Sequence, residues 1–580
     1  MTKEKKQTGY PSIDKPWEVG YSFFKRKPVI PDISIYSLLK LICTGKMRNT
    51  AIDCGELTVS YKKLFQDTEI VSSALEALGV KRGDIVTICI PNYYQAVVPF
   101  LACNRIGAVA TYLNPGMSDE EIKEYLAQFN SPILFNFGRN EQDNAAFLKD
   151  SPVNYTITLH EDSLNELKMN RICGDYLHTR QLNYHSLGTL VRGHKQPRTH
   201  LLSGNDCALI LYTSGSTGQP KSVLLTNKNV LAALIYANNT SNWKDLGISR
   251  IMVCVPFAYP YGLVTSLLSA LFSGSTAILA PDIGKGTIQY YYAKQPEMVF
   301  GSPALLDLTI SGIPEGQDLS TVKSFISGGD FLTTSHAEKG KRFFAAHNAK
   351  TEIGNGAGNA ETVSIATTPA GVKNKPETVG KVLVGSSALV VDSETMQEKK
   401  YGEEGMLCIA GKHVFKGYYR EPKLTAEAKF LFGEKEYFKT GTLGYLDEEG
   451  YFTLTGRASR FYICSSLNKI YLDHVQGLIC RFDCVDDCAV VKVPDEEQLY
   501  VNYAYIVLRD GWQGTAETGA KILDLFRHPV ALPDGKQDQL KDFEIPRKII
   551  FVNQLPRRSG TDKIDYRALE ELAKEESNNA

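Results

Sequence analysis

The chain has 580 residues, of which 43% are hydrophobic and 22% are charged, and its 64 Lys and Arg residues against 65 Asp and Glu residues give a net charge of −1. This composition is that of an ordinary globular protein and excludes a wholly disordered, collagen-like or coiled-coil chain. The balanced charge argues against a surface built mainly to bind nucleic acid or anionic lipid. The length predicts roughly three or four structural units, or one large body with a smaller domain.

The cysteines and the N-terminus favour a reducing, cytoplasmic location. Twelve cysteines among 580 residues are too few for a disulfide scaffold. Cys480, Cys484 and Cys488 are spaced by four residues and could share a helix face, but no His stands near them at metal-ligand spacing. We therefore interpret these three cysteines as core residues. The first residues are charged and lack the apolar segment of a signal peptide.

One uncharged stretch, residues 251–281, is long enough to be considered as a membrane span. Pro256, Pro260, Gly262 and Gly274 interrupt it, whereas a lipid-exposed span needs about 20 apolar residues in one unbroken helix. We predict a buried strand, a turn and a helix here, and no membrane span.

The first 55 or so residues are predicted to be a polar lead-in with short helices. From residue 57 to about residue 330, predicted strands and helices alternate, a pattern typical of βαβ units and a parallel sheet. We expect helices over residues 61–78 and 95–107, and a further helix that starts with a capping box formed by Ser118 and Glu121. The expected strands are 85–90, 108–113, 207–212, 250–255, 275–280, 298–300 and 324–326.

After about residue 379 the pattern changes to short strands and glycine-rich turns, as over residues 405–410, 437–445 and 451–454. This pattern predicts a small antiparallel or barrel-like unit. The last segment mixes strands with helices. The sequence thus predicts an α/β fold: an N-terminal body, residues 1–455, of βαβ-type subdomains plus the small β-rich unit, and a small mobile α+β domain, residues 459–580.

The most specific motif is the segment Tyr212-Thr213-Ser214-Gly215-Ser216-Thr217-Gly218-Gln219-Pro220-Lys221. It stands between two expected strands, and a helix follows the second. Its glycines permit a tight turn that brings N–H groups close to a ligand, and its hydroxyls and Lys221 add donors and positive charge. This pattern favours a polyphosphate site over a flexible Ser/Gly turn. It is not a Walker A loop, because no Gly-Lys pair in the chain is followed by Ser or Thr.

This segment resembles the signature loop of the acyl-adenylate-forming superfamily, which includes acyl-CoA synthetases, firefly luciferase and the adenylation domains of nonribosomal peptide synthetases. Other segments resemble motifs of that family in the same order. They are Gly79–Asp84 with Pro91-Asn92, Pro256–Gly262, Ser327–Asp330, Asn355–Thr362, Gly417–Tyr419, Thr440–Thr442, Gly456-Arg457 and Lys563–Asp565.

The resemblance implies a two-step reaction that uses ATP and Mg²⁺. A carboxylate attacks the α-phosphate of ATP and gives an acyl-adenylate and pyrophosphate. A thiol, either that of CoA or the phosphopantetheine of an acyl carrier protein, then takes the acyl group. The first step depends mainly on positioning and charge stabilisation. The implied partners are thus a small carboxylic acid, ATP and a thiol carrier, with no nucleic acid.

The resemblance also implies roles for individual residues. Glu361 would ligate Mg²⁺ together with Thr217, Lys563 would bridge carboxylate and phosphate oxygens, and Lys221 would add positive charge. Thr213 would contact the α-phosphate, and the β- and γ-phosphates would be held by Ser214, Gly215, Ser216, Thr217 and Gly218. The nucleoside and its nearest phosphate would be contacted by Gly329, Asn355, Gly356, Ala357, Thr442 and Arg457. Tyr259 and Gly328 would face the acid, and Ser459 would be the hinge.

Several positions depart from the family pattern. Ala357 stands where an aromatic ring usually packs on adenine, and Thr442 where an aspartate usually binds the ribose. Losing such a charged acceptor costs about 1.5–3 kcal/mol of binding free energy. Two interpretations remain open: an active enzyme with shifted nucleotide contacts, or a degenerate relative that binds nucleotide or acyl group weakly.

The sequence limits the chemical identity of the acid only in part. Residues 255–261 contain no carboxylate to pair with an α-ammonium, and a buried unpaired ammonium would be costly. We therefore expect a non-amino carboxylic acid. The apolar helix expected over residues 262–273, with Leu263, Leu267, Leu268 and Leu271, either lines an acyl pocket or is ordinary core.

Overall fold

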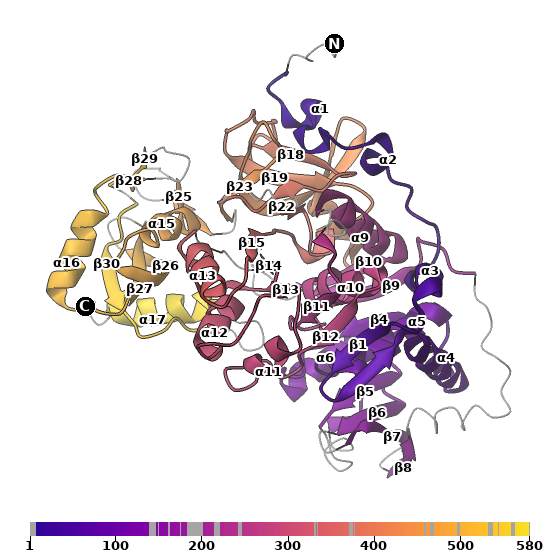
Figure 1. Ribbon diagram of the computed structural model, residues 1–580. Coiled ribbons are helices and arrows are strands. Elements are labelled where there is room, and N and C mark those ends of the chain that lie inside the picture. Colours follow the sequence, from indigo (N-terminus) through magenta and orange to yellow (C-terminus); the bar gives the residue numbers. More distant parts are fainter. Residues whose placement is uncertain are drawn as a thin grey trace.

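The computed structural model describes residues 7–138, 147–148, 150–160, 163–173, 176–182, 201–213, 221–241, 246–329, 332, 334–369, 375, 377–457, 460–463, 469–495, 499–531, 537–542, 544–557 and 563–578. They form a large N-terminal body and a smaller C-terminal domain, which lie side by side (Figure 1). The expected α/β class, with a body of two mixed sheets and a smaller β-rich unit, is confirmed.

The N-terminal segment runs along the outside of the body before the chain enters the sheets (Figure 1). It consists of α1 (Pro11–Asp14), η1 (Pro16–Glu18), α2 (Phe23–Arg26), α3 (Ile35–Ile42) and η2 (Thr44–Lys46). Trp17 is fully buried in the small β-rich unit, so this segment is packed onto the body from its first turns.

The first sheet has nine strands among the described residues, in the order β20-β10-β9-β4-β3-β5-β6-β7-β8. Its central strands, from β9 through β4, β3 and β5 to β6, are parallel, as the alternating pattern predicts. The strands are β3 (Ile85–Cys89), β4 (Val109–Tyr112), β5 (Ile133–Phe137), β6 (Tyr155–His160), β7 (Ser163–Cys173), β8 (Tyr176–Leu182), β9 (Cys207–Tyr212), β10 (Ser222–Thr226) and β20 (Gly417–Tyr418). The helices between them are α4 (Tyr61–Ala77), α5 (Tyr94–Ile106), α6 (Asp119–Phe129) and α9 (Asn227–Ser241). The capping box of Ser118 and Glu121 is present at α6.

The second sheet has seven strands among the described residues, in the order β15-β14-β13-β11-β12-β1-β2, and all but β2 run parallel. The strands are β1 (Thr50–Cys54), β2 (Leu57–Ser60), β11 (Arg250–Val253), β12 (Thr276–Leu279), β13 (Met298–Gly301), β14 (Ser324–Ser327) and β15 (Glu352–Asn355). Its helical elements are η4 (Tyr261–Leu268), α10 (Ser269–Ser273), α11 (Ile288–Ala293), α12 (Pro303–Gly312), α13 (Thr334–Ala346) and η5 (Ala360–Thr362).

The uncharged stretch folds as a buried strand, a turn and a helix, as predicted. The helix begins as the π-helix η4, and the Ser266 hydroxyl donates to the carbonyl of Tyr261 five residues earlier. In the part of the chain that the structure describes, no helix is both long and apolar enough to span a membrane.

The β-rich unit follows the second sheet and forms an antiparallel sheet in the order β18-β19-β22-β21, with β23 beside β22. Its elements are β16 (Thr367–Thr368), β17 (Lys381–Val382), β18 (Ser387–Val391), β19 (Gly405–Ala410), α14 (Pro422–Glu427), β21 (Lys429–Phe432), β22 (Lys435–Leu446) and β23 (Phe452–Arg457).

The C-terminal domain has its own core around the sheet β26-β27-β30. Its elements are β24 (Phe461–Ile463), β25 (Lys469–Tyr471), α15 (Leu472–Ile479), β26 (Val485–Asp495), β27 (Leu499–Leu508), α16 (Ala516–Leu525), β28 (Val530–Ala531), β29 (Gln537–Asp538), β30 (Lys548–Phe551) and α17 (Tyr566–Asn578). Cys480, Cys484 and Cys488 are all buried in this core, in line with our interpretation. They do not share a helix face, because α15 ends before Cys480 and Cys488 lies on β26.

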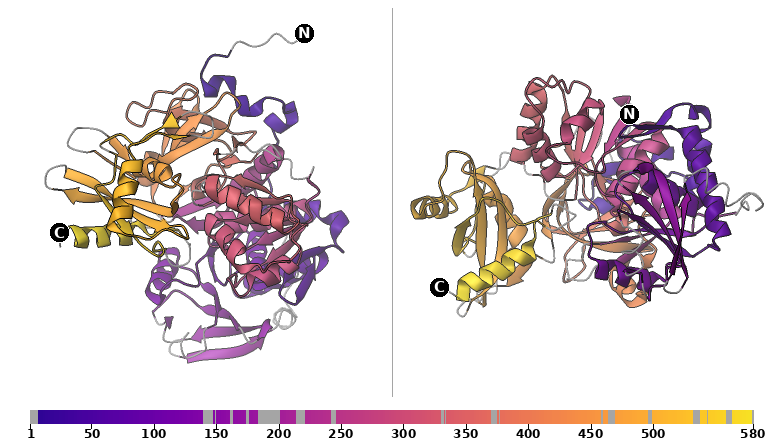
Figure 2. Two further views of the ribbon diagram at one scale, coloured as in Figure 1. Left: turned by 60° about the vertical axis from the view of Figure 1, so that its left-hand side comes forward. Right: turned by 90° about the horizontal axis from the view of Figure 1, so that it is seen from below.

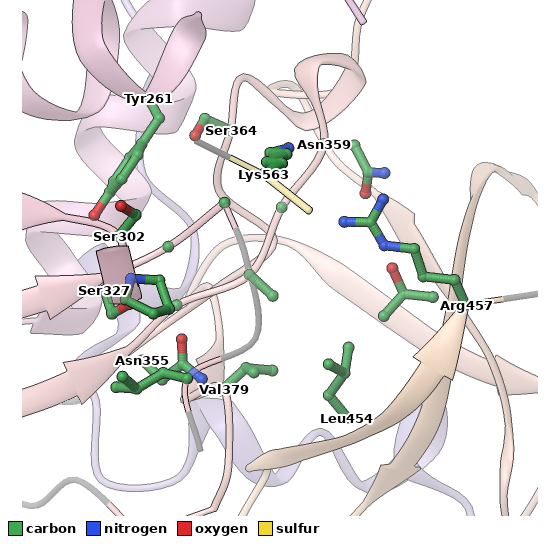
Figure 3. Close-up of a pocket in the computed structure, with 18 of the residues that line it drawn as sticks. Tyr261, Ser302, Ser327, Asn355, Asn359, Ser364, Val379, Leu454, Arg457 and Lys563 are labelled. Carbon is green, nitrogen blue, oxygen red and sulfur yellow. The ribbon is translucent and has the colours of Figure 1, made fainter. Parts of the chain in front are cut away.

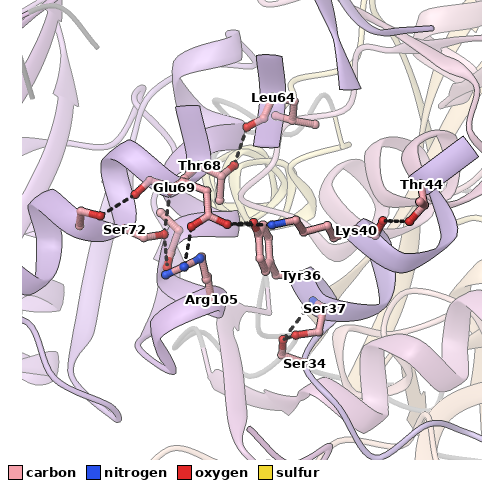
Figure 4. Close-up of polar contacts among 12 residues, drawn as sticks. Ser34, Tyr36, Ser37, Lys40, Thr44, Leu64, Thr68, Glu69, Ser72 and Arg105 are labelled. Atoms are coloured by element: carbon pink, nitrogen blue, oxygen red, sulfur yellow. Dashed lines mark hydrogen bonds and ion pairs between the residues drawn. The ribbon is translucent and has the colours of Figure 1, made fainter. Parts of the chain in front are cut away.

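One ion-pair network ties the N-terminal helix α3 to the body. Glu69 on α4 accepts a hydrogen bond of 2.6 Å from the Tyr36 hydroxyl and pairs with Lys40 at 3.0 Å and with Arg105 at 2.5 Å (Figure 4). Because Tyr36 and Lys40 belong to α3 and Arg105 to α5, a single carboxylate joins three helices.

Candidate active site

A cleft of 2820 Å³ lies between the body and the C-terminal domain, at the carboxyl ends of β13, β14 and β15 (Figure 3). Such a strand edge is where open α/β sheets usually bind ligands. Twelve of the residues expected at the site line this cleft: Thr213, Lys221, Tyr259, Gly328, Gly329, Asn355, Gly356, Ala357, Glu361, Thr442, Arg457 and Lys563. The others, Ser214, Gly215, Ser216, Thr217, Gly218 and Ser459, lie outside the described residues.

The two ends of the glycine-rich segment are held together by the antiparallel pair β9 and β10. Tyr212 pairs with Ser222 in the ladder. Beyond that pair, the Thr213 N–H donates to the Lys221 carbonyl at 3.0 Å, and the Lys221 N–H donates to the Thr213 hydroxyl at 3.3 Å. The segment is therefore the connection of a β-hairpin whose base borders the cleft.

Glu361 is a buried carboxylate in the wall of the cleft. Its side chain belongs to η5, the residue is 6% exposed, and Oε1 accepts a hydrogen bond of 2.7 Å from the Tyr418 hydroxyl. Burial raises the pKa of Glu361, although the Tyr418 hydrogen bond and the charge of Lys221 oppose this rise. A positively charged group close to the Glu361 carboxylate would therefore stabilise its charged form.

Tyr418 connects Glu361 to the hairpin. It lies on β20, which pairs with β10 through Val223 and Tyr418. The ammonium group of Lys221 lies 5.2 Å from the centre of the Tyr418 ring. The hairpin that carries the glycine-rich segment therefore also fixes the tyrosine that orients Glu361. Tyr418 could not be identified as a site residue from the sequence, because its contact partners are far away along the chain.

Replacing Tyr418 by Phe should lower the free energy of unfolding by about 1.5–3 kcal/mol near pH 8, because a buried carboxylate loses its charge-assisted hydrogen bond. The loss should shrink as the pH falls through the raised pKa of Glu361, because protonation removes the charge. Guanidinium denaturation over a series of pH values below 8 measures this. The control is Tyr419→Phe, which leaves the Glu361 contact in place. Equal effects of the two substitutions would contradict the assigned contact.

Lys563 enters the cleft from the C-terminal domain and approaches the end of β14. Gly329 has a φ of +85°, and a Cβ atom built on it would lie 4.0 Å from the Lys563 Cε. Gly328 is packed against Tyr261, because a Cβ built there would lie 3.2 Å from the ring carbon Cζ. These glycines therefore allow a lysine side chain to come close to the backbone at the strand edge.

The residues on either side of Ser459 attach to the C-terminal domain. The Arg457 N–H donates to the Asp473 carboxylate at 2.8 Å, and the Arg460 guanidinium pairs with the same carboxylate. The Arg460 guanidinium also lies 3.5 Å from the centre of the Tyr566 ring. These contacts fix the orientation in which the C-terminal domain presents Lys563.

Several residues that line the cleft carry buried oxygens with no hydrogen-bond partner within the described part of the chain. Among these oxygens are Ser327 Oγ, Asn355 Oδ1 and Asn359 Oδ1. Buried polar atoms are normally paired, so these oxygens indicate a ligand that offers N–H or O–H donors. Adenosine has such donors in its amino group and its ribose hydroxyls. The unpaired polar groups of the cleft are therefore suited to binding a nucleoside.

Asn359 is a candidate ribose contact that the sequence analysis did not single out. Its Nδ2 donates to the Thr440 carbonyl at 3.1 Å, which leaves Oδ1 available. Figure 3 shows Asn359 beside Arg457. Arg457 pairs in the β22–β23 ladder with Thr442, which replaces the expected aspartate. The signal was present in the motif at 355–362, but the spacing alone did not distinguish Asn359 from its neighbours.

Tyr259, which the sequence predicts to face the acid, lines the cleft together with Tyr261. Burial raises the pKa of the Tyr259 hydroxyl, which also has a hydrogen bond with Asn114. The Tyr261 hydroxyl donates to the carbonyls of Gly301 and Ile326, at 3.1 and 2.6 Å. The leucines of the following helix, Leu263, Leu267, Leu268 and Leu271, are fully buried in the core and are not part of the cleft lining. Of the two alternatives for this helix, the core interpretation holds.

A metal site in the cleft would have few protein ligands. Among the described residues, no group of three or more His, Cys, Asp and Glu side chains could hold a metal ion. A single buried carboxylate such as Glu361 fits Mg²⁺, which keeps several waters and is commonly bound by one or two carboxylates plus substrate phosphates.

Two family models cover most of the chain. The model of the AMP-binding enzymes matches residues 41–419, and that of the AMP-binding enzyme C-terminal domain matches residues 475–562. The fold and the cleft are those of the acyl-adenylate-forming type of protein. The chain belongs to the AMP-binding enzyme family.

Individual relatives span nearly the whole chain. A long-chain-fatty-acid–CoA ligase of Bacillus subtilis (strain 168) is 25% identical over 576 residues, which cover 96% of this chain and 98% of the relative. An oxalate–CoA ligase of Saccharomyces cerevisiae is 26% identical over 506 residues, 86% of this chain and 89% of the relative. The ATP-bound crystal structure of MatB from Rhodopseudomonas palustris has a TM-score of 0.77 and 25% identity, with 93% and 99% of the two chains covered. The chain is therefore similar to acyl-CoA ligases.

Proposed function

We infer that this protein activates a non-amino carboxylic acid with ATP as an acyl-adenylate, releases pyrophosphate and transfers the acyl group to the thiol of CoA. The observation that carries this inference is the convergence of three groups from separate segments on one cleft: Lys221 at the hairpin, buried Glu361, and Lys563 beside Gly329. Membership of the acyl-CoA ligase-like family supports it.

The first step needs charge stabilisation around the α-phosphorus of ATP. Lys563 would contact the oxygens of the acid and of the α-phosphate, where its compact charge offsets their repulsion. Thr213 and the loop 214–218 would bind the phosphates, with Lys221 adding positive charge. When bound, Mg²⁺ supplies charge neutralisation at the phosphate oxygens, and Glu361 with Thr217 would hold it.

The nucleoside would bind against β15. Asn355 Oδ1 is available to accept from the adenine amino group, and Asn359 Oδ1 and Arg457 are available for the ribose or phosphate. Ala357 provides no ring, so we propose that aliphatic Val379 and Leu454, which Figure 3 draws in the same pocket, supply the apolar contact. Nucleotide contacts are then shifted and not lost, which favours an active enzyme over a degenerate relative.

The second step would require a change in the orientation of the C-terminal domain, because Lys563 lies in the cleft beside Gly329, where the acid and the α-phosphate would meet. We propose that the body ends near residue 455 and that the C-terminal domain, from residue 459, rotates about Ser459 to admit the thiol. CoA is the preferred acceptor because the relatives are named as CoA ligases; loading of an acyl carrier protein is the alternative.

Thr442 should be the weak point of nucleotide binding. Replacing Thr442 by Asp should lower the KM for ATP about tenfold, because a charged acceptor for the ribose hydroxyls replaces a neutral hydroxyl. Thr442 pairs with Arg457 across β22 and β23, so the new carboxylate has a cation opposite it. Steady-state kinetics against ATP measure this, with Thr442→Asn as the neutral control. An unchanged KM in the Asp variant would mean that the ribose is bound elsewhere.

The acid should be compact, because Tyr261 crosses the space between η4 and the ends of β13 and β14. Its ring is packed against Gly328 and its hydroxyl is bonded to two strand-end carbonyls. The named acids of the relatives range from oxalate to long-chain fatty acids, so the choice depends on this chain's own side chains.

Replacing Tyr261 by Ala should raise kcat/KM for longer acids by at least about tenfold relative to the shortest acid accepted, since each methylene that gains a pocket contributes about 0.8 kcal/mol. A panel of acids of increasing length measures this. The control, Tyr261→Phe, keeps the ring and should keep the native preference. A native enzyme that already prefers long acids would contradict the assignment.

The proposed function is tested by acid-dependent release of pyrophosphate from ATP–Mg²⁺ over a panel of non-amino acids, followed by mass analysis of the products with CoA present. We expect release with at least one acid, and an acyl-CoA of the matching mass. Release without thioester on CoA, but with a phosphopantetheinylated carrier, would favour the carrier-protein alternative. Nucleotide binding without release for any acid would support the degenerate interpretation.

A further inference from the structure

A group of large apolar side chains is exposed on the N-terminal segment. Within residues 19–29, which we call the N-terminal patch, Val19 is 73% exposed, Phe23 58%, Phe24 82% and Val29 86%. Single exposed apolar residues are common on protein surfaces, but four within eleven residues, two of them adjacent phenyl rings, indicate an interaction surface.

The N-terminal patch is held firmly on the body, so its exposure does not result from a frayed end. Before it, Trp17 is fully buried and its indole N–H donates to the Ser386 carbonyl at 3.4 Å. Within it, the Tyr21 hydroxyl donates to the Thr240 carbonyl at 3.1 Å. After it, Ile30 is 6% exposed. The body therefore presents the phenyl rings in a defined place.

The charge of the N-terminal patch is all of one sign. Lys25, Arg26 and Lys27 follow the two phenylalanines, and no Asp or Glu occurs between residues 19 and 31. The ammonium group of Lys27 lies 5.6 Å from the centre of the Phe23 ring, so cations and apolar groups share one surface. The net charge of −1 for the whole chain does not reveal this local excess of three positive charges.

The N-terminal patch lies on the side of the body away from the C-terminal domain. Figure 1 places α2 on the side of the body opposite α15 to α17, and the view from below in Figure 2 keeps the two apart. A partner bound at α2 would therefore leave the C-terminal domain free to move.

We propose that the N-terminal patch docks the protein on the surface of an anionic lipid bilayer. The two phenyl rings and two valines would enter the boundary between headgroups and acyl chains, and the three cations would contact lipid phosphates. An anionic membrane matches this combination because it offers apolar and negatively charged groups at the same interface. The docking is peripheral, since it needs no spanning helix.

The test is sedimentation of the full-length protein with vesicles, in the absence of ATP and acid. We expect binding to vesicles of phosphatidylcholine with 40% phosphatidylglycerol, on the order of a hundredfold weaker binding to pure phosphatidylcholine, and weakening in 0.5 M NaCl because salt screens the cations. The triple variant Lys25→Gln, Arg26→Gln, Lys27→Gln should lose on the order of a hundredfold in affinity. The variant Phe23→Ser with Phe24→Ser should lose about tenfold or more.

Matched controls separate the N-terminal patch from general charge and apolarity. Leu431, which is 75% exposed on β21, is the apolar control as Leu431→Ser. Lys350, Lys412 and Lys423, all exposed and replaced together by Gln, change the net charge by the same amount elsewhere on the surface. Both controls should bind vesicles as the native protein does. No binding of the native protein to anionic vesicles, or equal losses in patch and control variants, would overturn the proposal.

Discussion

Replacing Lys563 by Ala should slow acid-dependent pyrophosphate release by about 10²–10³-fold, the cost of removing one preorganised group that stabilises charge in a transition state. The reason is its position: Lys563 approaches the backbone at Gly329, on the strand edge where the acid and the α-phosphate would meet. The free energy of unfolding should change little, because the side chain lines the cleft and is not part of a core cluster. ATP binding should change less than the rate, because the transition state carries the charge that Lys563 would stabilise.

The control for this substitution is Lys574→Ala, an exposed lysine on α17 of the same domain. Pyrophosphate release should be unaffected there. Lys563→Arg should recover only part of the native rate, because a planar guanidinium does not reproduce a compact ammonium charge. Unchanged pyrophosphate release in the Lys563→Ala enzyme would remove this residue from the first step.

Replacing Glu361 by Gln should lower the rate of pyrophosphate release at least a hundredfold and raise the Mg²⁺ concentration needed for half-maximal rate, because the amide cannot supply the charge that a hard cation prefers. The amide oxygen can still accept from the Tyr418 hydroxyl, so the local packing is kept. Titration with Mg²⁺ at fixed ATP measures the effect, with Glu427→Gln, which also lines the cleft, as the control.

The same substitution should make the nucleotide-free protein more stable at neutral pH. Burial raises the pKa of Glu361 above its ordinary value of 4.5, so the folded chain binds more protons than the unfolded chain between the two values. Stability from this group therefore falls as pH rises through the raised pKa, and Gln avoids that loss. The gain in the Gln variant should disappear below pH 4.5. Equal stability of the two proteins at pH 8 would contradict the buried-carboxylate account.

The elements with a clear periodic pattern could be predicted from the sequence. The strand expected over residues 207–212 matches β9, and the helices around α4 and α5 differ from expectation by one residue at most ends. These elements are long or mostly buried, so local hydrophobicity determines them. The π-helical start of η4 could not be predicted, because it differs from an α-helix by one extra residue per turn and not by its apolar pattern.

The candidate site was predictable where a motif is contiguous and not where it depends on distant pairing. Glu361 and Lys563 stand in motifs of several residues. Tyr418 reaches Glu361 only because the two-residue strand β20 pairs with β10, nearly 200 positions away in the chain. So short a strand has no periodicity to detect. The N-terminal patch could not be predicted from the sequence for another reason. The exposure of a side chain depends on how the body packs, and Trp17 holds this segment on the body through a hydrogen bond to residue 386.

The most direct test of this account is a crystal structure of the protein with Mg²⁺ and a non-hydrolysable ATP analogue. We expect the β- and γ-phosphates at the hairpin between Thr213 and Lys221, with Mg²⁺ at about 2.0–2.1 Å from the Glu361 carboxylate. A nucleotide bound outside this cleft, or a metal ion with no contact to Glu361, would contradict the central claim.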